Sequence, residues 1–375
     1  MNITILGSGF AALTAIEQVR RSARKANIRV IAPSKRFIYY PSLIWLPSGL
    51  KTREDITWDL QHFFQKYKVE FVQAKVITIE DEGRLVKTDI GDFSNDGLII
   101  ATGCRFQNHL PGVENVQIAC RFDTADRLKK RLQTLASGTI AVGFDVNPDE
   151  PTAMRGPGPV LEYVLGIDTL LRKQRRRRKF NLVFFSPESD LIREFGDKGH
   201  QRILKLLKKR RIKVIFGQLI KGFEDNKVLL DDSVINADLT LFQPGMTGAG
   251  WLDNTGLPRS PAGLVQADEH TQVAGWSKTY VVGDAGSYPG PDWQPKLGVN
   301  AVIQAKVAAV NVINDIKKPK RAKQSITVKM IYIIDMLNRG MLVKRSEKGI
   351  KILPALRIFH RLKILVEKKH LKKFG

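Results

Sequence analysis

Cysteine is scarce in this chain, which has two cysteines in 375 residues. Cys104 and Cys120 are too few for a disulfide scaffold, and they do not form a Cys-x-x-Cys motif. Their scarcity excludes a small disulfide-rich secreted fold. It indicates a compartment that is reducing, or at least one that does not demand stabilising disulfide bonds. No metal site is predicted.

Long apolar runs are also missing. No run approaches the roughly 20 apolar residues of a membrane-spanning helix. The first apolar run, residues 3–6, lacks a signal-peptide cleavage site. We therefore expect neither a transmembrane helix nor a signal peptide. Because 43% of the residues are hydrophobic, the chain can bury a large core, and we expect two intertwined α/β domains.

Acidic residues are few relative to basic ones. The net charge is +24, and residues 317–375 carry 18 Lys/Arg against 3 Asp/Glu. This excess predicts an anionic partner, either a membrane surface or nucleic acid. No nucleic-acid-binding module is visible, so nucleic acid is disfavoured. A second basic run, residues 172–179, is interpreted as a solvated face, or as a further contact with the same anionic surface.

The most informative motif present is a nucleotide-binding signature split between the two ends of the chain. An apolar strand at residues 3–6 enters a glycine turn, and a second apolar strand at 279–282 ends in Gly283-Asp284. In the first element, Gly7 permits the tight turn and Gly9 lets the backbone approach a pyrophosphate. Ala12 stands where the usual motif has its third glycine. The helix expected over residues 11–22 aims its free N–H groups at the phosphates. The predicted cofactor-binding residues of this turn are Gly7, Ser8, Gly9, Phe10, Ala11 and Ala12.

Two further strand ends belong to the same predicted site. The strand at residues 28–31 lacks the acidic residue that usually bonds a ribose hydroxyl, so Ser34 or Lys35 is left to substitute for it. The strand at residues 97–100 ends in Ala101, Thr102 and Gly103. Ligands of doubly wound folds lie at the carboxyl ends of strands, so these residues are expected beside the cofactor.

With these motifs the chain resembles the flavoproteins with two dinucleotide-binding domains. Within them it looks most like sulfide:quinone oxidoreductases and flavocytochrome c sulfide dehydrogenase flavoproteins. The closer resemblance rests on an aromatic-Pro loop, a Gly-Pro-x-x-Glu-aromatic helix start and a Pro-Lys-x-Gly element. These lie at residues 37–43, 158–163 and 295–298.

The resemblance implies an α/β fold of two interleaved Rossmann-like domains, followed by a C-terminal β/amphipathic-helix tail. The FAD-binding domain would comprise residues 1–110 and 240–320. The second, degenerate NAD-type domain would comprise residues 111–239, and a membrane-associating region would comprise residues 321–375.

The resemblance also implies roles for residues near the C-terminal half of the signature. Gly283 and Asp284 would bind FAD, with the aspartate accepting from the ribityl chain. Lys296 would lie near the flavin ring or at the start of the following helix, beside Gly298. There a cation could stabilise negative charge on the reduced flavin. The alternative for Lys296 is one more lysine in a lysine-rich chain.

The second βαβ unit, which begins at residue 138, lacks a glycine-rich pyrophosphate loop. Its strand runs into a segment that contains Asp145, Asp149 and Glu150. These carboxylates would repel a pyrophosphate, so a nicotinamide cofactor is disfavoured.

The cysteines do not match the pattern of the family. It oxidises sulfide with two redox cysteines, one before the Gly-Pro-x-x-Glu helix start and one near the C-terminus. Neither is present here, because no cysteine follows Cys120. Without a thiolate there is no nucleophile for sulfur. Cys120 matches either a third family cysteine near the flavin, linked to it in some members, or a buried structural thiol. Cys104 is expected near the cofactor with no assigned role.

The tail predicts a basic amphipathic helix, with Pro354 in its first turn. Such a helix lies in a membrane interface, with its basic groups drawn to anionic lipid. The alternative is a surface helix packed on its own domain. The apolar residues at three- to four-residue spacing are Leu353, Leu356, Phe359, Leu362, Leu365, Val366, Leu371 and Phe374. The basic residues are Arg357, Arg361, Lys363, Lys368, Lys369, Lys372 and Lys373.

The sequence therefore predicts an FAD-dependent oxidoreductase on the cytoplasmic face of a membrane, passing electrons from an unidentified donor to a quinone. Lys296 and Cys120 are the candidate catalytic residues. Three alternatives remain: a type II NADH dehydrogenase-like enzyme, a sulfide oxidase using Cys104 and Cys120, and a non-catalytic flavin-binding membrane adaptor. A homo-oligomer is left open.

Overall fold

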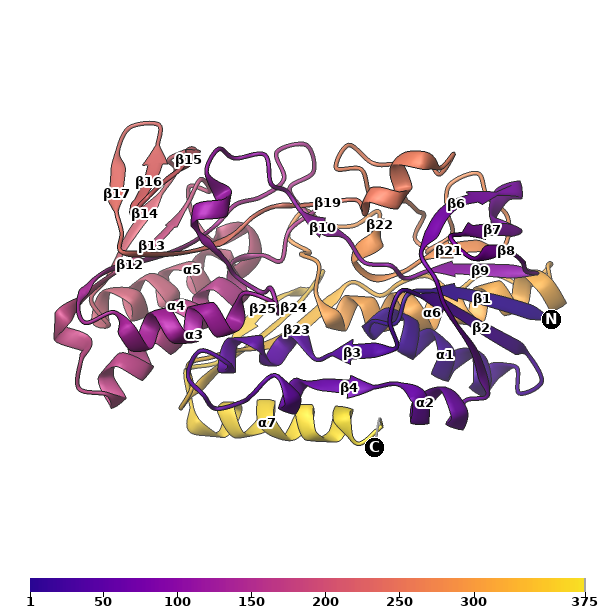
Figure 1. Cartoon of the computed structure of the whole chain (residues 1–375), viewed down its shortest axis with the longest axis horizontal. Coiled ribbons are helices and arrows are strands. Elements are labelled where there is room, and N and C mark those ends of the chain that lie inside the picture. The colour runs from indigo at the N-terminus through magenta and orange to yellow at the C-terminus, as the bar shows by residue number, and fades with distance from the viewer. Residues whose placement is uncertain (374–375) are drawn as a thin grey trace.

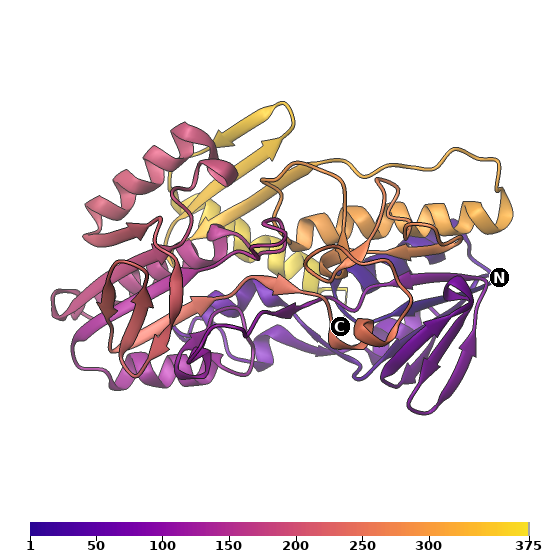
Figure 2. The same cartoon turned by 90° about the horizontal axis from the view of Figure 1, so that it is seen from above.

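The protein is described by a computed structural model over residues 1–373. Phe374, the predicted end of the apolar side of the tail, lies outside the described residues. The molecule is elongated, with a parallel sheet in each half and the C-terminal helix along one edge (Figure 1). In the view from above, the C-terminal strands and the final helix of the chain lie between the two halves (Figure 2).

The first half is built on a five-stranded parallel sheet in the order β21-β9-β1-β2-β5. Its central strands are almost wholly apolar and buried, as expected where helices and loops cover both faces of a sheet. The strands are β1 (Asn2–Leu6), β2 (Asn27–Ala32), β5 (Val69–Gln73), β9 (Gly97–Ile100) and β21 (Thr279–Val281).

Two helices from opposite ends of the chain pack together in this half. They are α1 (Phe10–Ser22) and α6 (Gly298–Lys317). Both bury small side chains, including Ala12, Ala15 and Ala308, which lets the helix axes approach closely. The first half is therefore completed only by residues from the last third of the chain.

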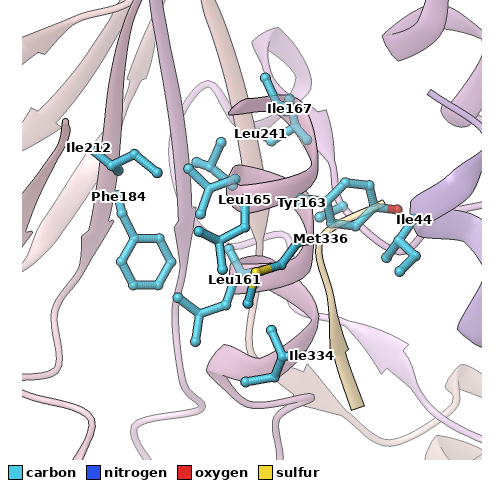
Figure 3. Close-up of a cluster of buried hydrophobic side chains, with 14 of the residues drawn as sticks. Ile44, Leu161, Tyr163, Leu165, Ile167, Phe184, Ile212, Leu241, Ile334 and Met336 are labelled. Carbon is cyan, nitrogen blue, oxygen red and sulfur yellow. The ribbon is translucent and has the colours of Figure 1, made fainter. Parts of the chain in front are cut away.

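The second half is built on another parallel sheet, in the order β11-β18-β12-β13-β14. Its core lies around helix α4 (Pro157–Lys173), where Leu161 and Leu165 meet Phe184 (Figure 3). The strands are β11 (Gln117–Ile118), β12 (Gly138–Phe144), β13 (Phe180–Ser186), β14 (Ile212–Phe216) and β18 (Leu239–Gln243). The other helices are α3 (Ala125–Thr134) and α5 (Ile192–Lys209), which is broken at Gly196 (φ 65°).

The C-terminal region forms a three-stranded antiparallel sheet and helix α7 (Arg357–Leu371). The strands are β23 (Lys329–Asp335), β24 (Gly340–Ser346) and β25 (Gly349–Ile352). Pro354 lies before α7, whose N-cap is Leu356, so its predicted place in the first turn is wrong. Among residues 1–373, no helix has the length and apolar character to cross a bilayer.

Smaller elements connect these units. The strands are β3 (Arg36–Ile38), β4 (Thr57–Asp59), β6 (Val76–Glu80), β7 (Leu85–Thr88), β8 (Gly91–Ser94), β10 (Arg105–Phe106), β15 (Ile220–Glu224), β16 (Lys227–Leu230), β17 (Val234–Asn236), β19 (Met246–Thr247), β20 (Val265–Gln266) and β22 (Gly286–Ser287). The helical turns are α2 (Gln61–Lys66), η1 (Tyr40–Trp45), η2 (Glu54–Ile56), η3 (Asp81–Gly83), η4 (Val113–Asn115), η5 (Arg177–Lys179), η6 (Gly250–Asn254) and η7 (Gly283–Ala285).

The predicted fold class, with two interleaved Rossmann-like domains and a C-terminal strand and helix region, is confirmed. The domain boundaries remain a proposal. Since β18 pairs with β11 and β12, its pairing favours a return to the first domain after Gln243 rather than at residue 240.

Candidate functional site

The turn between β1 and α1 requires its first glycine. Gly7 has φ +107°, a conformation that side chains other than glycine rarely adopt. A Cβ built there would lie 2.9 Å from the carbonyl carbon of Ala101, and closer still to its oxygen. The ends of β1 and β9 therefore meet at this glycine.

The second glycine faces open space. Gly9 is the N-cap of α1 in an extended conformation, with no side-chain cap and no acidic residue in the first turn. Among residues 1–373, no atom other than those of the adjacent residues lies within 4 Å of a Cβ built on it. The free N–H groups of the helix start therefore face a space that a phosphate group could enter.

Both halves of the split signature meet at this helix start. A Cβ on Gly283 (φ +71°) would lie 3.2 Å from the Cβ of Ala11, and Ala12 is fully buried behind it. Gly298 opens α6, with its Cβ position 4.0 Å from the Phe10 ring. The structure thus brings residues 7–12 together with Gly283 and Gly298, as the site requires.

The end of β2 contributes a serine beside the glycine turn. Ser8 Oγ donates to the backbone carbonyl of Ser34 at 3.0 Å, and the Ser34 hydroxyl accepts from the N–H of Arg36. Lys35 instead donates to Gln61 Oε1 at 3.3 Å and lies 3.9 Å from Asp59. Of the two candidate ribose contacts, Ser34 is therefore better placed, while Lys35 is held by other partners.

The end of β9 provides a second open backbone position. Ala101 donates its N–H to Leu6, and the Thr102 hydroxyl accepts from the Trp251 indole at 3.3 Å. Gly103 has φ +68°, and apart from its two neighbours in the chain no described residue has an atom within 4 Å of its Cβ position. These residues line the same edge of the sheet as Gly7 and Gly283.

Asp284 is paired with an arginine that the sequence analysis missed. Its carboxylate lies 2.8 Å from Arg155, which also donates to the Lys296 carbonyl at 3.2 Å. Both side chains of the ion pair are largely buried. Burial alone would lower the pKa of Arg155, but Asp284 outweighs it and the pKa is raised. Nothing in the local sequence distinguishes this arginine from the many others on the chain.

Lys296 is buried, with 8% of its surface exposed. Its ammonium donates to the Gly286 carbonyl and lies 5.5 Å from the centre of the Tyr288 ring. Burial lowers the pKa of Lys296, and the carboxylates of Glu150 and Asp284 oppose that shift. A cavity beside it is lined by Asp284, Asn300 and Gln304, together with Glu150 from the acidic loop.

The two cysteines are poor nucleophiles in this setting. Burial raises the pKa of each thiol to about 12, and Arg155 opposes the shift in both cases. Cys120 lies in the left-handed region (φ 62°), and its Sγ is 3.5 Å from Gln243 Oε1. At neutral pH both residues are thiols rather than thiolates, which disfavours nucleophilic attack on sulfur. The catalytic role of Cys120 stays a prediction.

The residues present fit FAD. The glycine turn leaves room for a pyrophosphate beside Gly9, and Gly103 leaves a second open position at the next strand end. Buried Asn300 Oδ1, on the adjoining cavity, has no hydrogen-bond partner in the described structure. FAD would be held by the α1 N-terminus and by residues 283–284, whose aspartate would have to share its carboxylate with Arg155.

The corresponding helix start in the second half is crowded by protein side chains. The N-terminus of α4 begins after Gly156, where a Cβ would collide with the Glu194 carboxylate. A Cβ on Gly158 would lie 2.8 Å from the Tyr332 ring. Tyr332 donates its hydroxyl to Glu194, and burial raises the pKa of that carboxyl to about 7. Side chains, one of them acidic, thus crowd the N-terminus of α4, the helix of the second half that corresponds to α1.

Helix α7 has an unusual orientation. Its outward side chains include Ile358, Leu362, Leu365 and Val366, which are 40–64% exposed. Its single buried residue is Glu367. A row of apolar side chains on this helix therefore faces solvent, while Phe359, Ile364 and Leu371 are half-buried against the body of the protein.

The inward side of α7 is held by polar contacts. His360 lies 2.6 Å from Asp335, Lys363 donates to Glu162, and Glu367 accepts from Ser42 at 2.6 Å. Lys51 lies 3.2 Å from the same glutamate, and Lys373 lies 3.0 Å from Glu17 of α1. Lys363 and Lys373, two of the basic residues of the predicted membrane-interface helix, thus have protein partners. Phe359, assigned to the apolar row, is partly buried rather than exposed.

The basic run at residues 172–179 is only partly a solvated face. Asp168 of α4, whose side chain is fully buried, lies within 2.9 Å of Arg172, Arg177 and Arg210. Arg176 of the same run donates to the carbonyls of residues 132 and 135. Part of this run therefore holds the end of α4 rather than facing solvent.

Residues 1–143 match the family model described as pyridine nucleotide-disulphide oxidoreductase. A sulfide-quinone reductase of Aquifex aeolicus is 25% identical over 335 residues, covering 84% of this chain and 77% of the relative. A type II NADH:quinone oxidoreductase of Staphylococcus saprophyticus is 23% identical over 339 residues, covering 83% of this chain and 82% of the relative.

Among solved structures, the sulfide:quinone oxidoreductase of Aquifex aeolicus superposes with a TM-score of 0.91 at 22% identity, covering 100% of this chain and 91% of that chain. A Plasmodium falciparum NDH2 in complex with NADH superposes with a TM-score of 0.76 at 14% identity. The superposition covers 99% of this chain and 94% of that chain. The family match and the two relatives confirm the family resemblance and the FAD cofactor expected from the sequence, and the solved structures show the same fold.

Proposed function

We propose that this chain, an FAD-dependent oxidoreductase similar to the sulfide-quinone reductases, works at a membrane surface and passes electrons from a donor still to be identified to a quinone. The two-electron oxidation of the donor would balance the reduction of the quinone to a quinol, which takes up two protons. FAD supplies the redox chemistry when bound, because it can accept electrons from one substrate and return them to another.

Helix α7 is the observation that carries the proposal. Its exposed apolar side chains are flanked by Arg361, Lys368 and Lys369, which are also exposed. Apolar residues flanked by basic groups favour insertion into the interface of an anionic leaflet. The same helix packs beside the candidate FAD site, so a lipid-soluble acceptor would have a short route from the bilayer. The cytoplasmic face is part of this proposal.

This chain's own residues would hold and tune the cofactor. The N–H groups at the start of α1 would bind the pyrophosphate, and Asp284 would accept from a hydroxyl of the ribityl chain. Lys296 and Arg155 would supply positive charge at the other end of the site, which favours a reduced, negatively charged ring. Their burial strengthens these interactions, because water is excluded.

The electron donor is proposed to be neither NADH nor a sulfur species attacked by a cysteine pair. Glu194 and Tyr332 crowd the N-terminus of α4, the counterpart of α1, and the raised pKa values of both cysteines disfavour a thiolate. The NADH-oxidising alternative is supported by the similarity to the Staphylococcus saprophyticus relative.

Anaerobic reduction of the bound flavin tests the donor. The holoprotein would be mixed in turn with sulfide, NADH, NADPH and small thiols, and its flavin absorbance followed, before a short-chain quinone is added. We expect no rapid bleaching by NADH and reoxidation by the quinone after chemical reduction. Rapid bleaching by NADH would establish the NADH alternative, and failure of any quinone to reoxidise the flavin would favour a non-catalytic adaptor.

Vesicle sedimentation tests the membrane part of the proposal. Leu365→Glu places a charge in the exposed row of α7 and should reduce binding to vesicles of phosphatidylglycerol and phosphatidylcholine at least tenfold. Leu219→Glu is the matched control, because Leu219 is similarly exposed (57% against 61%) but lies in the second half of the molecule. Equal binding by both variants would reject α7 as the membrane contact.

A further inference from the structure

The last turn of α7 reaches the FAD end of helix α1. The His370 ring stacks on the Phe10 ring with 5.3 Å between centres and an interplanar angle of 29°. Tyr39 and Phe37 complete this aromatic cluster, with ring centres 5.5 and 6.3 Å from His370. Since Phe10 is the first residue of α1, the cluster adjoins the backbone that would hold the pyrophosphate.

A second contact joins the same two helices. Lys373, directly after α7, lies 3.0 Å from Glu17 of α1. Burial lowers the pKa of His370 to about 4, so its ring packs as a neutral group at physiological pH. The C-terminal end of α7 is thus tied to α1 by the stacking of His370 on Phe10 and by the ion pair between Lys373 and Glu17.

The remaining attachment of α7 to the body is weak for a helix of 15 residues. Its inward side makes ion pairs and hydrogen bonds, and the apolar side chains that pack against the body, such as Ile364 and Leu371, are half-buried rather than fully buried. These ion pairs are largely buried, with the carboxylates at most 8% exposed, so the loss of hydration of both charges offsets much of their attraction. Opening of α7 in free solution is therefore expected to require less free energy than global unfolding.

We propose that α7 couples the two ligands of the protein: binding of an anionic lipid surface to its outer side and binding of FAD beside α1 strengthen each other. This rests on the membrane attachment proposed above. A lipid surface that takes up the exposed apolar row would favour the docked helix, which keeps His370 stacked on Phe10. FAD at the helix start would stabilise the same arrangement from the other side. Thermodynamic linkage requires that each ligand change the affinity of the other by the same factor.

The release of FAD measures this coupling directly. FAD that leaves the holoprotein after dilution gains fluorescence, so its rate can be followed with and without vesicles containing phosphatidylglycerol. We expect vesicles to slow release about fivefold or more in the wild type. The complementary measurement compares the vesicle affinity of the holoprotein with that of the FAD-free protein, and this factor should equal the factor by which vesicles change the equilibrium affinity for FAD.

Substitutions at the aromatic stack separate coupling from attachment. His370→Ala should still bind vesicles, because the outer row is unchanged, but vesicles should no longer slow its FAD release. His370→Phe should restore the effect, since another flat ring can stack on Phe10. His109→Ala is the matched control, because His109 is an exposed histidine in the loop that follows β10, in a segment that is not part of α7 or of the aromatic cluster.

The outcomes distinguish this inference from the proposed function. Wild-type protein that binds vesicles but releases FAD at an unchanged rate would overturn the coupling and leave membrane attachment standing. Wild-type protein that fails to bind vesicles would overturn both. If His370→Ala does not fold, the holoprotein and FAD-free vesicle affinities of the wild type still decide the question.

Discussion

At the scale of single residues, the two glycines of the first turn have different tasks. Gly7 is required by the fold, because of its positive φ and the proximity of Ala101, whereas Gly9 is required only by what enters the space beside it. The sequence motif names both glycines but does not separate these tasks.

Alanine substitutions should separate them. Gly7→Ala should destabilise the FAD-free protein by about 2–4 kcal/mol, because a Cβ is strained at this φ and meets the β9 strand end. Gly9→Ala should leave the stability of the FAD-free protein within about 0.5 kcal/mol and weaken FAD binding at least tenfold. Denaturant unfolding and FAD titration check the pair. Normal FAD affinity in Gly9→Ala would place the pyrophosphate elsewhere.

Glu194 is expected to make stability depend on pH. Burial raises the pKa of this carboxyl to about 7, so the folded protein keeps a proton that the unfolded chain releases above about pH 4.5. The stability that this group contributes is full below pH 4.5 and is lost as the pH rises to 7.

Replacing the carboxyl by an amide tests this sign. Glu194→Gln should match the wild type near pH 4.5 and exceed its stability at pH 8 by about 1–3 kcal/mol. The measurement is the free energy of unfolding in urea at both values, compared between the two proteins. A difference that is the same at both pH values would show that the carboxyl does not titrate in this range.

At the scale of elements, the end of α4 depends on one carboxylate. Burial tends to raise the pKa of Asp168, but hydrogen bonds from Arg172, Arg177 and Arg210 outweigh it and lower the pKa. This cluster joins α4 to η5 and to the residue after α5. It explains why part of the basic run cannot serve as a free electrostatic surface.

Removing the carboxylate should be costly. Asp168→Ala leaves the largely buried Arg177 and Arg210 without their carboxylate partner and should destabilise the protein by about 3–5 kcal/mol. Arg172→Ala is the control, since its side chain is 48% exposed and its pair should contribute at most about 1 kcal/mol. Thermal and urea unfolding of both variants check the contrast. Similar losses in the two variants would refute it.

Helix α7 shows where sequence patterns stop being informative. The apolar spacing predicts the helix and its basic character, but it does not say which side faces the body. The inward contacts depend on Ser42, Glu162 and Asp335, which are distant in sequence and are brought there by the fold. Arg155 was missed for the same reason, because its partner Asp284 lies in another domain.

By contrast, the glycine turn and the strand ends could be predicted from the sequence. Each is a local pattern in which strand, turn and helix follow one another within about ten residues. The meeting of Ala11 with Gly283 also follows from that pattern, because parallel strands of one sheet end at the same edge. Which carboxylates and cations then pair across that edge depends on packing between distant segments.

At the scale of the whole molecule, charge should govern attachment. With a net charge of +24, association with phosphatidylglycerol vesicles should weaken at least tenfold between 0.05 and 0.5 M salt, estimated from screening of exposed charges. A residual salt-resistant fraction is expected from the apolar row of α7. Sedimentation at several salt concentrations checks this, with neutral phosphatidylcholine vesicles as control. Binding that does not respond to salt would assign attachment to apolar contacts alone.

The pairing of β21 with β9 has a consequence for how the chain is made. During synthesis, β9 emerges long before β21, and α1 emerges long before α6, its packing partner. Until residues 279–317 leave the ribosome, the first sheet has an open edge of unpaired N–H and C=O groups and α1 has an uncovered apolar side. The second sheet, whose strands lie between them in the chain, can form earlier. The nascent protein therefore passes through a long interval in which its N-terminal third is prone to aggregation and suited to chaperone binding.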